Sequence, residues 1–116
     1  MRPTATVPNV RGELLPGTLD MLVLRTLSVQ SVHGYAIAQH IERLSHDVLR
    51  VEQGSLYPAL ERLQQAGWIT SKWKITPTGR RARYYAITAS GRGRLHEKAT
   101  TYDRLTAAIA RVMGRT

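Results

Sequence analysis

The sequence predicts a mainly α-helical protein with one β-hairpin. Four segments have the apolar patterns of helices, and the pattern changes to alternation between residues 68 and 88. A proline and a glycine interrupt the alternating stretch, as expected for the turn of a hairpin. With 116 residues, of which 42% are apolar, the chain can form one compact domain with a small core.

The first helix is expected after a short N-terminal segment. Residues 1–15 show little periodicity and predict a flexible N-terminal arm. Pro16-Gly17-Thr18 indicates a break with Thr18 as a helix N-cap, and Asp20 then falls in the first turn. The helix that follows, LDMLVLRTLSV, is apolar on nearly every side, so we expect something besides its own domain to cover it.

Two further helices are predicted, each with apolar residues at i, i+4 and i+7. One begins after Gly34 and reads YAIAQHIERLS. The other lies within VEQGSLYPALERLQQAGWI, with Ser55 as its N-cap and Gly67 as the residue that ends it. Pro58 is placed in its first turn, where a missing amide costs no intrahelical hydrogen bond.

The alternating stretch predicts two strands. In WITSKWKI, the apolar Ile69, Trp73 and Ile75 fall on one side, opposite two lysines, and RRARYYAIT forms the second strand after the turn TPTG. The hairpin therefore carries five cations, Lys72, Lys74, Arg80, Arg81 and Arg83.

A last helix is predicted from about residue 88 to residue 113. Its apolar residues are spaced by seven, which is typical of a helix that packs along another helix. The residues in or beside this seam are Leu95, Ala99, Tyr102, Leu105, Ile109 and Val112. Lys98 occupies one seam position, and three repeats are too few to define a coiled coil.

The charge balance favours a polyanionic partner. Lysine and arginine outnumber acidic residues 17 to 8, for a formal net charge of +9. No Asp or Glu occurs between Arg62 and His96, so the positive charge is concentrated there.

The lack of cysteine excludes disulfides and cysteine nucleophiles, and the histidines lack ligand spacing, so we expect no metal and no cofactor. Neither a signal peptide nor a membrane span is recognisable, so we expect a cytoplasmic protein.

The order helix, helix, helix, basic hairpin, helix matches a winged helix-turn-helix followed by one further, C-terminal helix. If the leucines of the third helix face the core, Ser55, Tyr57 and Pro58 lie at its exposed N-terminal end. The positive end of the helix dipole is there and suits phosphates or base edges.

Four blocks in order, LLPGTLDMLVLRTL, HGYAIAQHI, EQGSLYPALERLQQAGWI and RRARYYAITASGRGRL, resemble the PadR family of bacterial transcriptional regulators. The similarity covers roughly residues 13–113, and the single C-terminal helix resembles the short PadR subgroup. The resemblance implies a homodimeric repressor that binds an inverted-repeat operator in double-stranded DNA and is released by an effector or a partner protein. It also implies a dimer formed through the last helix and the first, in which we place Leu19.

Residue roles carried over from the family follow the matching positions. The resemblance implies DNA contacts by Tyr35, Gln53, Gly54, Ser55, Tyr57 and Pro58, and a wing formed by Lys72, Lys74, Arg80, Arg81 and Arg83. The DNA-binding domain then spans residues 16–88 and the dimerisation helix residues 89–116. The turn TPT lacks the acidic or asparagine-rich residues often seen there, and Gln53 replaces a frequent acidic residue; both bear on operator preference.

Simpler interpretations stay open for several residues. Tyr57 and Tyr35 can be packing aromatics, and the wing cations can be a charged strand edge that prevents pairing. Trp68 and Trp73 fit packing in the core or wing root better than ligand stacking, and Tyr102 fits a dimer seam better than a pocket. An architectural or RNA-binding protein is the alternative function. We expect no enzyme, because Ser55 has no histidine assigned near it.

Overall fold

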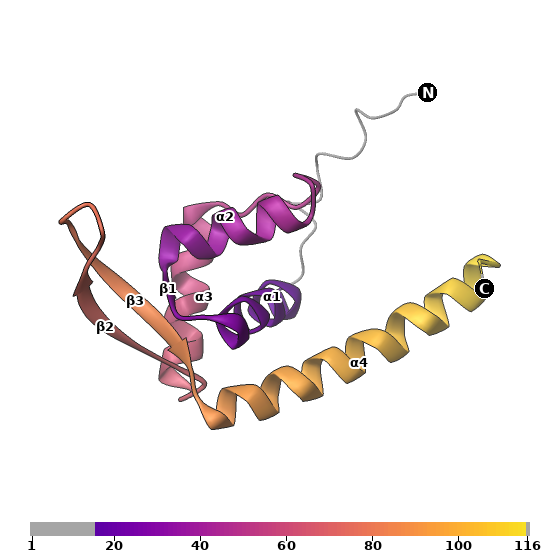
Figure 1. Cartoon of the computed structure of the whole chain (residues 1–116). Helices are drawn as coiled ribbons and strands as arrows, with labels where there is room; N and C mark the ends of the chain where they lie inside the picture. The colour runs from indigo at the N-terminus through magenta and orange to yellow at the C-terminus, as the bar shows by residue number, and fades with distance from the viewer. Residues whose placement is uncertain (1–15, 116) are drawn as a thin grey trace.

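The computed structural model describes residues 16–115, so the predicted arm of residues 1–15 lies outside the described residues. The elements follow one another as α1 (Pro16–Val29), β1 (Val32–His33), α2 (Gly34–Leu44), α3 (Gln53–Gln65), β2 (Ile69–Ile75), β3 (Arg81–Ile87) and α4 (Ala89–Met113). The hairpin of β2 and β3 and the far end of α4 project from opposite sides of a helical body (Figure 1). This is the predicted winged helix-turn-helix with a long C-terminal helix.

The core forms around α1. This helix contacts α2, α3, β3 and α4, and its residues Leu19, Val23, Leu24 and Leu27 are buried among apolar side chains of α2, α3 and β2. Burial of each leucine contributes roughly 1.5–3 kcal/mol relative to exposure. For these residues, the expectation of a cover from outside was wrong, because elements of the same chain enclose them.

The start of α1 differs from the sequence prediction. The helix already includes Pro16, so Thr18 is not its N-cap and Asp20 does not lie in its first turn. Asp20 Oδ1 instead accepts a hydrogen bond from Arg62 Nη2 at 2.9 Å. This ion pair connects α1 to α3 and gives Asp20 a tertiary role.

A two-residue strand that the sequence did not reveal precedes α2. The sheet is antiparallel with the order β1-β3-β2, and Val32 and His33 of β1 pair with Tyr85 and Tyr84. The His33 ring also caps α2, because its Nδ1 accepts from the Ala36 amide at 3.3 Å. Strand β1 therefore fixes the start of α2 beside the root of the hairpin.

Helix α3 begins three residues earlier than predicted, at Gln53, with Glu52 as its N-cap. The Ser55 amide donates to the Glu52 carbonyl, so Ser55 lies inside the helix and is not the cap. Pro58 falls in the second turn, where its missing amide would have bonded to the Gly54 carbonyl. The other end is as predicted, with Gly67 left-handed at φ 82°.

The hairpin and α4 agree with the sequence prediction. Strands β2 and β3 pair without a bulge from Ile69↔Ile87 to Ile75↔Arg81. Thr88 caps α4, where its Oγ1 accepts from the Gly91 amide at 2.9 Å and donates to the Gly67 carbonyl at 2.8 Å. Within residues 16–115, no helix has the length and apolar character needed to cross a membrane.

Candidate nucleic-acid interface

A hollow of about 800 Å³ separates the wing (β2, β3 and their turn) from the start of α3. Tyr35 and Tyr57 line its helical wall, and residues of the wing line the other wall. Its aromatic side chains are Tyr35, Tyr57, Trp73 and Tyr85, and its cations are Arg80, Arg81 and Arg83. No acidic residue of the described part of the chain lines the hollow. A site with this lining suits an anion that also has flat or apolar parts.

Tyr57 packs and remains accessible. Its side chain is 42% exposed, while its ring covers Gly34 at the start of α2. A Cβ atom added at Gly34 would lie 2.9 Å from Cε1 of Tyr57, so a larger residue at this position would displace the tyrosine ring. Packing at the junction of α2 and α3 therefore leaves part of the ring open to a ligand in the hollow.

The other residues expected to contact DNA are exposed at two helix starts. Tyr35 lies in the first turn of α2 and lines the hollow. The exposed residues Gln53, Gly54, Ser55 and Pro58 lie in the first two turns of α3 but not in the lining of the hollow. The structure thus groups Tyr35 and Tyr57 with the wing arginines and places the remaining α3 residues on the adjacent surface.

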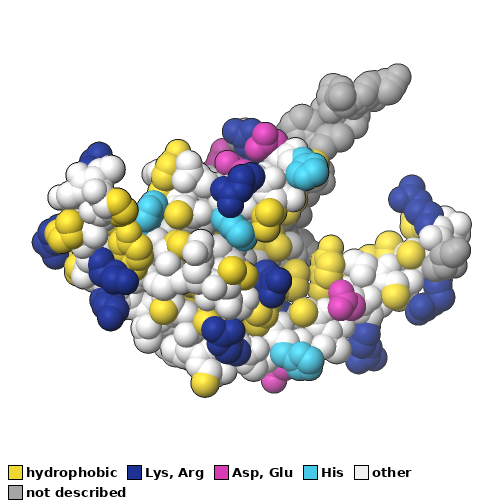
Figure 2. Space-filling view, in the orientation of Figure 1, with side chains coloured by type: hydrophobic (Ala, Val, Ile, Leu, Met, Phe, Trp, Pro, Cys, Tyr) yellow, Lys and Arg dark blue, Asp and Glu magenta, His cyan; other side chains and the backbone are white. Residues whose placement is uncertain are grey.

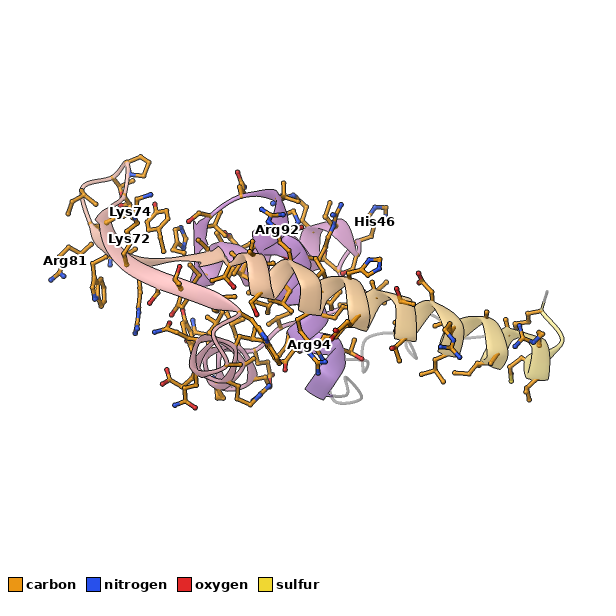
Figure 3. The ribbon with its side chains drawn as sticks, turned by 90° about the horizontal axis from the view of Figure 1, so that it is seen from below. His46, Lys72, Lys74, Arg81, Arg92 and Arg94 are labelled. Atoms are coloured by element: carbon orange, nitrogen blue, oxygen red, sulfur yellow. The ribbon has the colours of Figure 1, made fainter. Side chains whose placement is uncertain are left out.

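The five wing cations do not form one cluster. Arg81 and Arg83 pair across the strands with Ile75 and Trp73, so they share the face that continues from the buried root residue Ile69. Lys72 and Lys74 pair with Tyr84 and Ala82 on the opposite face, and Arg80 lies in the turn. Figure 3 marks Lys72, Lys74 and Arg81 on the hairpin. Only the arginines line the hollow.

Neighbouring side chains hold the two inner arginines in place. Arg83 Nε donates to Ser71 Oγ at 2.9 Å, and the Arg81 guanidinium lies 4.8 Å from the centre of the Trp73 ring. Lysine and arginine side chains stand among apolar ones on the wing at the left of Figure 2, where no acidic side chain is visible. The guanidinium groups are therefore oriented before any ligand arrives.

Tyr85 adds a neutral donor to this wall. Burial raises the pKa of its phenol, and the nearby Arg83 guanidinium opposes that shift. The hydroxyl consequently keeps its proton at neutral pH and can donate a hydrogen bond to an anion.

The two tryptophans have different environments. Trp68 is partly buried against the core, and the Arg94 guanidinium lies 4.8 Å from its ring centre, which agrees with packing at the wing root. Trp73 is 58% exposed on the wing, so the expectation of core or root packing was wrong for it. It lies five positions further along the chain, in the part of β2 where no residue is buried.

The residues expected in a dimer interface fall into three groups. Tyr102, Leu105, Ile109 and Val112 are exposed along α4 and form an apolar seam that no residue between 16 and 115 covers. Leu95 packs against the core, and Ala99 lines a groove between α1 and α4. Leu19 was expected in the dimer interface, but it lies in the core and is only 6% exposed. It therefore has almost no surface to contribute to a contact with a second copy.

The sequence did not reveal the groove of about 630 Å³ between α1 and α4. Met21, Leu22 and Arg25 line one side, and Leu95 and Tyr102 are among the lining residues of α4. Only the tertiary contact of the two helices creates it, so no local signal could have identified it.

Among the described residues, no group of three potential metal ligands comes together.

Comparisons with known proteins agree with this architecture. The family model for the transcriptional regulator PadR-like family matches residues 23–97. The transcriptional regulator Rv3488 of Mycobacterium tuberculosis is 32% identical over 83 residues, which cover 72% of this chain and 74% of that protein.

Two solved structures show the same fold. The protein smu.1704 of Streptococcus mutans has a TM-score of 0.76 at 27% identity and covers 88% of this chain and 92% of its own. The PadR-like transcriptional regulator BC4206 of Bacillus cereus has a TM-score of 0.75 at 26% identity, with 87% and 96% covered. The chain described here belongs to the PadR-like family of transcriptional regulators.

Proposed function

We propose that this chain is a cytoplasmic, homodimeric repressor that binds an inverted-repeat DNA operator. Residues 16–88 bind the duplex, and residues 89–116 hold two copies together. An effector or a partner protein releases the operator.

The observation that carries this proposal is the lining of the hollow. Tyr35 and Tyr57 stand opposite Arg81 and Arg83, with no acidic residue between them. The positive end of the α3 dipole lies beside the same space. We infer that one phosphodiester strand of the duplex occupies the hollow, while the exposed start of α3, Gln53 to Pro58, enters the adjacent major groove.

The apolar seam of α4 supports a second copy of the chain as its cover. An isologous interface places the same seam on both partners, so each exposed leucine or isoleucine is buried by an identical surface. The two-fold axis would then present two α3 helices to half-sites about one helical turn, roughly 34 Å, apart.

The groove between α1 and α4 supports control by an effector. It adjoins the seam and combines Tyr102 with Leu22 and Met21, which suits a partly apolar molecule. An occupant that binds one arrangement of α1 and α4 more tightly shifts the dimer toward that arrangement. The spacing of the two recognition helices would change with it.

The test is protection mapping on the DNA upstream of this protein's own gene, followed by competition. We expect a protected segment with two-fold symmetry, which bulk duplex DNA and RNA displace only in large excess. Equal binding to the upstream DNA, bulk DNA and RNA would refute the repressor and identify a nucleic-acid-binding protein without sequence preference.

Tyr57→Ala gives a residue-level check of the same proposal. Operator affinity should fall, while the fold should be retained with a modest loss from the uncovered Gly34. Thermal melting, measured beside operator binding, separates the two effects. Collapse of the fold would make Tyr57 a structural residue only.

A further inference from the structure

The wing exposes an apolar pair that the fold does not use. Trp73 and Ile75 are 58% and 65% exposed, and the strand register places both on the same face as Arg81 and Arg83. This face carries Trp73 into the lining of the hollow. The pair therefore belongs to the inner side of the wing, beside the proposed DNA strand.

Two large apolar side chains this exposed are expected to be covered by a partner. β2 is an edge strand of the sheet, and an exposed tryptophan and isoleucine on an edge invite aggregation unless a partner covers them. The wing of a second copy is a poor cover, because it would bring Arg81 and Arg83 against their own equivalents. An anionic partner that also has apolar parts would complement both the positive charge of the two arginines and the apolar surface of Trp73 and Ile75.

We propose, on the basis of the DNA-binding function proposed above, that Trp73 and Ile75 pack against deoxyribose of the strand held by Arg81 and Arg83. Sugars are the apolar part of the backbone, and phosphates border them on both sides. On this face, the apolar Trp73 and Ile75 of β2 stand directly opposite the cationic Arg83 and Arg81 of β3. A phosphodiester strand likewise places apolar sugars directly beside its phosphates.

This contact adds a part of the affinity that does not depend on salt. Phosphate contacts release counterions and give a steep salt dependence, whereas apolar burial releases none. Replacing Trp73 and Ile75 together by alanine should weaken binding roughly 30-fold for a dimer, without a change in the slope of affinity against salt. Leu44→Ala is the matched control, because Leu44 is also 65% exposed but lies at the far end of α2.

The salt slope also tests the main alternative. In this alternative, Trp73 makes no contact with DNA and acts solely by holding the Arg81 guanidinium, which lies 4.8 Å from the centre of its ring. In that case the slope would fall with the affinity, and Trp73→Phe, which keeps an aromatic ring, would restore both. A fall in slope would overturn the proposal of direct sugar packing.

The emission of the two tryptophans provides a direct readout. The chain contains two, Trp68 at the wing root and Trp73 on the exposed wing. Trp68→Phe leaves Trp73 as the only reporter, and Trp73→Phe leaves Trp68 as the matched control. The probes are a duplex covering the protected upstream segment and a mixed-sequence duplex at low salt, with binding followed separately through a label on the DNA.

We expect bound DNA to change the emission of Trp73 and shield it from a neutral quencher, while Trp68 stays unchanged. Bound DNA without any change at Trp73 would overturn the proposal and leave the repressor function standing. A change on both duplexes with equal affinity would instead support the wing contact and refute the repressor. Failure to bind either duplex would refute both.

Discussion

The wing and the far end of α4 both project from the helical body and both expose apolar side chains (Figure 1). Their electrical surroundings differ. On the wing, Trp73 and Ile75 stand among cations with no acidic residue on either strand. On α4, the seam is bordered by both signs, including Asp103 and Arg104. Exposed apolar surface indicates that a partner exists, and the charge around it indicates which kind.

This comparison predicts that the α4 seam binds a second copy of the chain. Leu105→Asp places a carboxylate in that seam on both copies, where burial of an unpaired charge costs several kcal/mol. We expect monomers by sedimentation, with helix content retained in circular dichroism. Thr100→Asp makes the same charge change on an exposed position of α4 outside the seam and should leave the dimer intact. Dimers of the Leu105 variant would show that another surface holds the copies together.

A second, smaller effect is expected on the salt dependence of DNA affinity, and it should differ between the two faces of the wing. Arg81→Ala with Arg83→Ala removes four cations from the inner faces of a dimer, so the slope of log affinity against log salt should flatten by roughly 3 to 4. Lys72→Ala with Lys74→Ala removes the same charge from the outer faces and should flatten it far less. Binding measured across a salt series decides the question. Equal flattening would mean that DNA meets both faces of the wing alike.

The smallest expected effect concerns how α4 is attached. A Cβ atom at Gly91 would overlap the Trp68 carbonyl oxygen, whereas one at Gly93 would enter open space. Gly91→Ala should therefore lower the free energy of unfolding by about 1–3 kcal/mol. Gly93→Ala should be neutral or stabilising by up to about 1 kcal/mol. Urea unfolding of both variants tests this, and equal stability would refute the close approach of α4 to the wing root.

Most elements could be predicted because their signals are local. The stripe of Leu56, Leu60 and Leu63 indicates a helix, and Gly67 ends it where a left-handed residue is needed. The start of that helix was misplaced, because Ser55 is a good cap in isolation and nothing local excludes Glu52. Strand β1 was missed because two residues form a strand only when a partner strand lies beside them.

The candidate site was predictable in its residue types but not in its arrangement. Tyr57 and the wing arginines could be named from the sequence. The contact of the Tyr57 ring with Gly34 and the hydrogen bond from Arg83 to Ser71 join residues that are far apart in the sequence, so only the tertiary fold creates them. The prediction that Trp73 packs in the core or wing root was wrong. Alternation shows which side of a strand a residue occupies, but it does not show whether the core extends as far as that residue.

By itself, the sequence determined the order of helices and strands, the excess of positive charge and the side of each element on which every residue falls. These properties depend on backbone periodicity and on residues close along the chain. Only the tertiary structure decided which sides are covered. Leu19 and Leu105 are both leucines on apolar stripes of helices, yet one is enclosed by α1's neighbours and the other faces outward. Burial depends on contacts between distant segments, and no local pattern contains that information.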